Sequence, residues 1–365
     1  MILKLVWENV RFRPVRTMLS VLLIAVPVTL ILTLIGLSHG FLQDSAKRAE
    51  GVGADIIFRP PDSALLSFSG APMPDKFIDV LSKEPHVAAV AGVVMQQVGG
   101  TFDSVSGIDP AQFARLSGPF IYYEGHGLEK PDDMLLDQYY ANQRHAHAGQ
   151  KLNVLNREWD VVGIVEPGKL SHLFVQLATL QQLVGDTGKL SAIYIKLDNP
   201  ANTTMVIDQL RAKYEGYKLY SLKELTSAYS VQNIPLLSGF INAVMGIGVV
   251  IGFAVVSLSM YMAVLQRTRE IGILKSLGAS KGFVLGIILA EAFALGLGGT
   301  IVGIVFSFGT RALMHSLMQA SLPQAIVPTW WPIAGLIAMG AALLGALYPG
   351  MLAVRQDPIE ALAYE

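Results

Sequence analysis

The feature that most constrains the fold is a long stretch near the amino terminus without any charged side chain. Residues 17–43 contain no Lys, Arg, Asp or Glu, and most of them are apolar. A helix needs about 20 apolar residues to cross a hydrocarbon core about 30 Å thick. The stretch is longer than the apolar core of a cleaved signal peptide, which has about 7–15 residues, and no small-residue cleavage site follows it closely. We therefore predict a retained membrane helix over residues 18–40.

Three further apolar stretches follow in the last third of the chain, at about 238–265, 282–309 and 330–352. Glycine interrupts them and charges are few, as membrane helices tolerate. Charged residues make up only 15% of the whole chain, against about 25% in a typical soluble protein. The sequence therefore predicts an α-helical membrane protein with four transmembrane helices, the last three in a C-terminal membrane domain at 236–365.

Basic residues are distributed unevenly around these stretches. Four precede the first span and four separate the second from the third, whereas residues 312–329 contain none. Since loops rich in Lys and Arg stay in the cytoplasm, both termini are predicted to be cytoplasmic and residues 41–235 to lie outside. Residues 1–17 place Trp7 and Val10 on one side at helical spacing, which predicts an amphipathic helix on the inner leaflet; a plain polar leader is the alternative.

The region outside the membrane repeats one order of elements. A strand, a helix and a strand are expected at 54–60, 74–84 and 86–100, and again at 191–198, 202–214 and 217–221. Two such β-α-β halves predict a ferredoxin-like α+β domain, with residues 100–190 as an inserted, strand-rich subdomain. The following residues, 221–240, are expected to form one helix that runs from this domain into the second span.

No motif predicts an enzyme or a metal site. The run "GDTGKLS" at 185–191 lacks the first glycine of a phosphate loop, and Leu190 stands where such a loop has Ser or Thr, so a turn is expected. His145 and His147 have no third ligand at metal spacing and indicate a solvated loop, as do His86, His126 and His172. Asp132 and Asp133 indicate a loop or a helix start rather than an acid–base pair. Nucleic-acid binding is not expected, because no dense basic cluster occurs.

One charged segment between the second and third spans, "QRTREIGILKSLGAS" at 266–280, has a helical pattern. Ile271, Leu274 and Leu277 recur at intervals of three, and Gly278 is a natural helix stop. Arg267 is expected to pair with Glu270 three residues later. Arg269 and Lys275 add further cations. The segment is thus predicted to present an apolar ridge to a groove in another protein; attachment to the lipid surface is the alternative.

Glu291 stands about ten residues into the third span, where a carboxylate is costly and usually faces other helices. It either takes part in proton or substrate transfer, or pairs with a polar group and joins helices. Small residues around it, among them Gly298 and Gly303, predict close helix packing.

Two motifs carry a resemblance to a known family. "RTREIGILKSLGAS" resembles the segment that follows the second span in MacB/FtsX-type ABC transporter permeases. The C-terminal "YPGMLAVRQDPIEALAYE" is similar to the closing motif of the same family, here with Arg355, Asp357, Pro358 and Glu360. The order of one span, a large outer domain and three spans also matches, so that the resemblance covers the whole chain and is strongest at both ends.

The resemblance implies a permease subunit in the bacterial inner membrane, working as a dimer, that couples ATP hydrolysis by a separate cytoplasmic ABC ATPase to movements of the outer domain. This mechanotransmission would expel a hydrophobic or amphipathic cargo, with a periplasmic adaptor protein and membrane lipid as further partners. ATP and Mg would be bound by the ATPase, and this chain would hold no cofactor. The alternatives are a scaffold that regulates a cell-wall hydrolase and a permease that releases lipoproteins. The coupling residues implied by the resemblance are Arg267, Arg269, Glu270, Ile271, Leu274, Lys275, Leu277 and Gly278.

Overall fold

The computed structural model describes residues 14–61, 63, 72–98, 103–228, 235–318 and 323–355. The chain forms two compact units. The helical unit comprises residues 1–38, 234–313 and 325–365, and the sheet unit comprises residues 39–233 and 314–324. Most of the amphipathic helix predicted at 1–17 lies outside the described residues, as do Asp357, Pro358 and Glu360 of the C-terminal motif.

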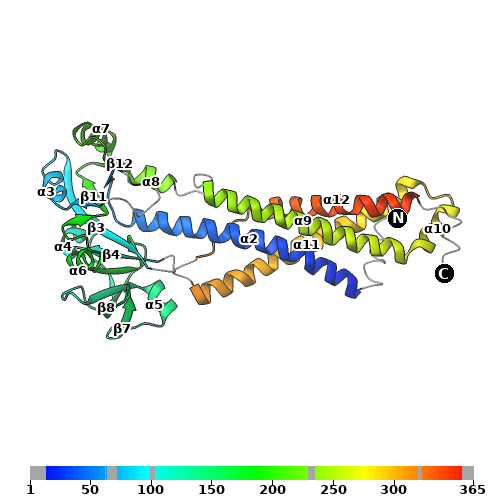
Figure 1. Ribbon diagram of the computed structural model, residues 1–365, viewed down its shortest axis with the longest axis horizontal. Coiled ribbons are helices and arrows are strands. Elements are labelled where there is room, and N and C mark those ends of the chain that lie inside the picture. Colours follow the sequence, from blue (N-terminus) through cyan, green and yellow to red (C-terminus); the bar gives the residue numbers. More distant parts are fainter. Residues whose placement is uncertain are drawn as a thin grey trace. The chain divides into compact units, whose positions relative to one another are not determined.

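Four long apolar helices build the helical unit (Figure 1). By length and composition, each of them is able to cross a membrane, and each contains one of the four predicted spans. The predicted fold class of four membrane helices is therefore confirmed. The helices are α2 (Pro14–Glu50), which belongs to this unit up to residue 38, α9 (Pro235–Gln266), α11 (Lys281–Met318) and α12 (Trp330–Arg355).

Glycines let α11 approach α2 closely. A Cβ atom at Gly299 would lie 2.5 Å from Cγ2 of Ile24, and one at Gly303 would lie 2.7 Å from Cβ of Val28. Such distances are far below van der Waals contact, so only glycine fits at either position. Within lipid, the hydrophobic effect does not drive two helices together, because lipid tails are as apolar as the helix surfaces. Van der Waals contact between closely packed helices stabilises their association instead. The close packing expected of the small residues in the third span is therefore present.

Hydroxyl pairs join α2 to two other helices of the unit. Ser20 Oγ lies 2.8 Å from Ser259 Oγ of α9, and Thr33 Oγ1 lies 2.8 Å from Thr310 Oγ1 of α11. Hydroxyl groups that are removed from water need such partners. The two pairs therefore fix α2 against both neighbours.

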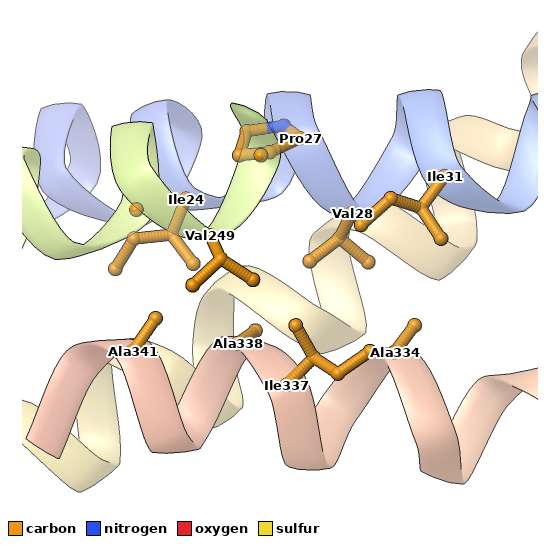
Figure 2. Close-up of a pocket in the computed structure, with 11 residues that line it drawn as sticks. Ile24, Pro27, Val28, Ile31, Val249, Ala334, Ile337, Ala338 and Ala341 are labelled. Atoms are coloured by element: carbon orange, nitrogen blue, oxygen red, sulfur yellow. The ribbon is translucent and has the colours of Figure 1, made fainter. Parts of the chain in front are cut away.

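A small cavity of about 20 Å³ lies between α2, α9 and α12. Figure 2 shows Pro27 of α2, Val249 of α9 and Ala338 of α12 among the residues that line it. Pro27 has no backbone N–H and so interrupts the hydrogen-bond ladder of α2. The lining side chains are all apolar and give a water molecule no polar partner. At about 20 Å³, the cavity is a packing gap beside the proline.

The sheet unit contains a ten-stranded sheet, flanked by short helices on both faces. Its strands are β1 (Ile56–Arg59), β3 (Val87–Gln97), β4 (Ser104–Ile108), β5 (Tyr122–Gly125), β6 (Asp133–Asp137), β7 (Lys151–Val154), β8 (Arg157–Val165), β9 (Leu173–Gln176), β11 (Ala192–Leu197) and β12 (Lys218–Ser221); β2 (Met73–Pro74) and β10 (Lys189–Leu190) form a separate pair. The helices are α3 (Phe77–Leu81), α4 (Pro110–Ser117), α5 (Gln138–Arg144), α6 (Leu177–Val184), α7 (Thr203–Lys213) and α8 (Leu222–Ala228), with a 3₁₀ turn η1 at Pro200–Asn202.

The ferredoxin-like prediction is confirmed by the strand order. The four strands of the two β-α-β halves lie side by side as β12-β1-β11-β3, and all three neighbouring pairs are antiparallel. The second half has thus paired with the first, with β11 inserted between β1 and β3. Alternate residues of β1 point to opposite faces: Ile56 and Phe58 join the apolar cluster beneath α3 and α7, whereas Ile57 joins the cluster beneath α4 and α8.

The inserted residues are strand-rich, as predicted, but their strands extend the same sheet. β4 pairs with β3, and the order continues through β9, β6, β8 and β5. The hydrophobic pattern of single strands does not reveal which edge they join, and this is why the sequence indicated a separate subdomain.

The last turn of α2 belongs to the sheet unit and packs tightly within it. The N–H of Leu170 donates to the carbonyl of Arg48 at 2.9 Å. A Cβ atom at Gly51 would lie 1.8 Å from the carbonyl oxygen of Gly168, which leaves space for glycine alone. Backbone therefore meets backbone where this helix ends.

Buried polar and charged side chains add further contacts at the end of α2. His172 Nδ1 lies 2.6 Å from Asp137 Oδ2, while Nε2 contacts the guanidinium of Arg48, which also pairs with Asp44. Because arginine has only donors, Nε2 accepts a hydrogen bond and Nδ1–H donates to Asp137. His172 is only 4% exposed, so the prediction that it lies in a solvated loop was wrong. Its partners are 35 and 124 residues away in sequence, and no local pattern indicates them.

The middle of the helix predicted at 221–240 lies outside the described residues. α8 ends at Ala228 and α9 begins at Pro235, with residues 229–234 outside the described residues. α2 is a long described helix that contributes to both units, with residues 14–38 in one and 39–50 in the other.

Candidate functional site

The charged segment between the second and third apolar helices forms a short helix of its own, α10 (Thr268–Ser276). Glu270 stands in its first turn and Lys275 in its last, and each charge has the sign that the helix dipole favours at that end. Arg267 occupies the N-cap position but makes no capping hydrogen bond with its side chain. α10 is therefore separate from α9 and α11 and not a continuation of either.

Gly278 stops this helix, as predicted. Its φ of 92° lies in the left-handed region, which glycine adopts without strain. The N–H of Ala279 donates to the carbonyl of Leu274 at 3.0 Å, and the N–H of Gly278 donates to that of Lys275 at 3.0 Å. These two bonds form a Schellman motif, which satisfies carbonyl groups left open at the helix end. The length of α10 is thus fixed by its own sequence.

The predicted stripe of Ile271, Leu274 and Leu277 is divided between two sides of α10. Ile271 packs against the apolar core of the helical unit and Leu274 is half-buried, whereas Leu277 is 80% exposed. Positions three apart rotate by about 60° from one another on a helix with 3.6 residues per turn, so the prediction of one exposed ridge was wrong.

Residues four apart reveal the exposed side instead. Ile273, which the sequence analysis did not select, is 44% exposed, and it stands four residues from both Arg269 and Leu277. The spacing of four is the sequence signal that identifies it. We call the exposed side of α10 its outer face, which consists of Arg269, Glu270, Ile273, Ser276 and Leu277.

Arg267 pairs with Glu291 of α11 and not, as predicted, with Glu270. Arg267 NH1 lies 3.3 Å from Glu291 Oε2. The side chains are only 13% and 8% exposed, and the two residues are 24 apart in sequence. Of the two interpretations of Glu291, the structure agrees with pairing to a polar group and a role in joining helices.

Lys275 ties the other end of α10 to α12. Its Nζ donates to the carbonyl of Val354 at 2.9 Å, in the last turn of α12. α10 thus has a polar contact to α11 and another to α12.

A cavity of about 90 Å³ adjoins the Arg267–Glu291 pair. α10 faces it through Ile271 and Leu274 of its inner side and through the exposed Glu270. The rest of its wall comes from Arg267 and from residues of α9 and α11, which are Met260, Ala263, Val264, Val284, Ile287, Ile288 and Glu291. The inner side of α10 is thus loosely packed next to a buried ion pair.

The motifs that sequence analysis set aside have structural roles. Gly185, with φ 79°, ends α6, and a turn leads from it into β10. His147 lies 3.3 Å from Glu124, whose pKa is lowered because the N–H of Ala148 and His147 both donate to its carboxylate. Among the described residues, no group of three His, Cys, Asp or Glu side chains is arranged to hold a metal ion. Arg355, the described residue of the C-terminal motif, is exposed at the end of α12.

Two family descriptions match this chain. The MacB-like periplasmic core domain matches residues 17–213, and the FtsX-like permease C-terminal domain matches residues 242–358. The second match includes α10 together with both of its polar contacts.

Named relatives agree with these matches. The ABC transporter permease YknZ of Bacillus subtilis is 27% identical over 60% of this chain and 55% of its own length. The macrolide export ATP-binding/permease protein MacB of Hahella chejuensis is 24% identical over 99% of this chain and 60% of its own length. The chain thus spans less than two thirds of either relative. Among solved structures, the periplasmic region of MacB from Actinobacillus actinomycetemcomitans is 15% identical, with a TM-score of 0.38, and covers 51% of this chain and 96% of that one.

Proposed function

The chain belongs to the family of proteins with a MacB-like periplasmic core domain and an FtsX-like permease C-terminal domain, and from this we propose that it is the membrane subunit of an ABC export system. In this proposal a cytoplasmic ABC ATPase hydrolyses ATP, and the permease passes the resulting movement to the part of the chain outside the membrane. The 365 residues contain no phosphate loop, which supports an ATPase site outside this sequence.

The observation that carries the proposal is the outer face of α10. It combines two exposed apolar side chains, Ile273 and Leu277, with the cation Arg269, and it lies between two apolar helices. A short amphipathic helix with an uncovered apolar side fits a groove in a partner protein. Since α10 is also joined to α11 and α12 by polar contacts, a push on this face would reach two membrane helices.

The distribution of basic residues supports a cytoplasmic position for α10. Arg267, Arg269, Lys275 and Lys281 surround it, whereas residues 312–329, between α11 and α12, contain no Lys or Arg. By the positive-inside rule, both termini and α10 face the cytoplasm of a bacterial inner membrane, and the sheet unit lies outside. The ATPase and the outer face of α10 are then on the same side.

Mechanotransmission is supported by α2, which contributes residues to both units. Its last turn is held in the sheet unit by backbone contact at Gly51 and by the buried Arg48–His172–Asp137 contacts. We propose that the cargo is a hydrophobic or amphipathic molecule, in keeping with the name of the macrolide export relative. A dimer of permease chains and a periplasmic adaptor complete the proposed assembly.

A substitution on the outer face of α10 tests this proposal. Leu277→Asp places a carboxylate where an apolar groove is expected. The partner tested is the ABC ATPase encoded nearest to this gene. We expect the amount of this ATPase that co-purifies with the chain to fall at least tenfold. Val80→Asp is the matched control, because Val80 of α3 is also apolar and 44% exposed but belongs to the sheet unit. Equal recovery of the ATPase with both variants would refute the docking role of α10.

A further inference from the structure

The Arg267–Glu291 pair connects a helix junction to the interior of the next helix. Arg267 is the residue between the end of α9 and the start of α10, while Glu291 lies within α11. Both side chains are almost fully buried, and the residues around them are mostly apolar. The pair therefore joins the helix junction directly to α11 through a buried, charged contact.

Such a pair is a weak source of stability. Removing two charges from water costs about as much as their attraction returns, and apolar replacements are often equally stable. What a buried pair supplies in favourable cases is a single register, because every other arrangement leaves a charge unpaired. Because Arg267 lies between α9 and α10, its pairing with Glu291 sets the position of the start of α10 relative to α11.

Apolar packing alone does not fix α10 here. The cavity of about 90 Å³ lies beneath its inner side, between Leu274 and the facing Ile288 of α11. Loose packing of this kind leaves α10 room to tilt, since side chains at the edge of an unfilled space lose contacts on that side. The polar contacts at its two ends, Arg267 to Glu291 and Lys275 to Val354, therefore add to the packing of Ile271 in holding α10 in place.

From this arrangement we infer that Glu291 is a positioning residue for coupling: through Arg267 it fixes α10 to α11, so that a displacement of α10 by the ATPase becomes a displacement of α11. The inference rests on the proposed function, because it presumes an ATPase on the outer face of α10. Arg267 and Glu291 are not on that face, and the loss of their pair is expected to leave the ATPase bound.

Three variants distinguish positioning from simple stabilisation. Glu291→Gln leaves Arg267 unpaired, Arg267→Gln with Glu291→Gln removes both charges, and Arg267→Glu with Glu291→Arg exchanges them. A purely structural pair predicts that the doubly neutral chain behaves like the wild type, because both charges of the pair are removed together. A positioning pair predicts that this chain folds and binds the ATPase but does not respond to ATP, and that the exchanged chain regains the response.

The response is measured as movement of α11 against α9. The chain contains no cysteine, so Gly246→Cys and Gly309→Cys introduce two unique spin-label sites, and no atom of a neighbouring helix lies within 4 Å of a Cβ at either. The full chain is purified with its ATPase in lipid nanodiscs, with labelled chain diluted by unlabelled chain so that one copy of the proposed dimer carries the labels, and pulsed EPR distances are compared with and without ATP and Mg²⁺. We expect a distance change in the wild type, less than one third of it in Glu291→Gln and in the doubly neutral chain, and at least half of it in the exchanged chain.

Each outcome decides the inference. A wild-type response in the doubly neutral chain overturns it, and so does an exchanged chain that folds, binds the ATPase and still does not respond. If the exchanged chain does not fold, Arg267→Lys, which keeps the charge, takes its place and is expected to retain at least half of the response; loss of it overturns the inference. A wild-type chain that retains no ATPase contradicts the proposed function and with it the inference, and ATPase recovery alone identifies that case.

Discussion

The substitution Asp137→Asn tests the buried contacts that hold the end of α2 in the sheet unit. In the wild type, Asp137 accepts two hydrogen bonds, from His172 Nδ1–H at 2.6 Å and from the N–H of Tyr140 at 2.8 Å. Asparagine has the same shape but only one acceptor oxygen. Whichever way its amide turns, one of the two donors meets an NH₂ group. Arg48 prevents His172 from escaping this conflict by a change of tautomer, because its guanidinium requires Nε2 as an acceptor.

The cost follows from the burial of these groups. Asp137 is 1% exposed and His172 is 4% exposed, so water cannot replace the missing acceptor. A hydrogen bond to a charged group contributes about 1.5–3 kcal/mol, and a buried donor without a partner costs about 1–3 kcal/mol. We therefore expect a loss of about 3 kcal/mol or more in the free energy of opening of this region, which is on the order of a hundredfold in the opening equilibrium.

Hydrogen exchange measured by mass spectrometry on the full chain reports this loss locally. Peptides that contain the last turn of α2 and strand β9 are expected to exchange on the order of a hundredfold faster in Asp137→Asn. Asp198→Asn is the matched control: Asp198 also pairs with a histidine, His86, at 3.1 Å, but both side chains are exposed. The contacts described here are refuted if the two substitutions change exchange in their own regions to the same extent.

Two further predictions concern packing and pH. Gly303→Leu places a side chain against Val28 of α2, where even a Cβ would lie 2.7 Å from the nearest atom. We expect less folded protein in detergent, measured by size-exclusion chromatography. Gly309→Leu on the same helix has open space and is expected to behave like the wild type. The Lys213 ammonium donates to Glu84 and lowers the pKa of that carboxyl. The stability that the Lys213–Glu84 contact contributes is present above the unfolded pKa of about 4.3 and is lost as the pH falls through the lower folded pKa. Glu84→Gln should therefore make the melting temperature of the chain less dependent on pH between about pH 5 and pH 3.

Features that arise from local physical constraints were predictable from the sequence. A charge-free stretch such as 17–43 is long enough to span a membrane, and exposing so much apolar surface to water would be unfavourable. A membrane helix is therefore the expected structure. The stop at Gly278 depends on its own backbone freedom, and it lies where the sequence places it. The two β-α-β halves carry their own periodicity, so the ferredoxin-like pairing of β1 with β11 and β12 could be predicted as well.

Features that depend on distant partners were not predictable from one sequence. Arg267 has a carboxylate three residues away in Glu270, and the helical spacing favours that pair, yet Glu291 is the partner that the fold brings to it. The reason is burial: an exposed pair of neighbours is worth only a few tenths of a kcal/mol, whereas an unpaired carboxylate inside an apolar bundle costs several. Arg267 therefore pairs with Glu291, whose buried carboxylate would be more costly to leave unpaired than the exposed carboxylate of Glu270.

The proposed transmission of movement needs a helix that contributes to both units. The sequence favoured residues 221–240, of which 229–234 lie outside the described residues, whereas α2 is described as one helix with residues in both units. α2 contains a proline, Pro27, yet its helix continues through that position. A helix interior loses one hydrogen bond at a proline but keeps its neighbours on both sides, so it bends without ending. α2 thus satisfies the two conditions for transmission, continuity and a fixed end, and the fixed end is the buried contact that Asp137→Asn removes.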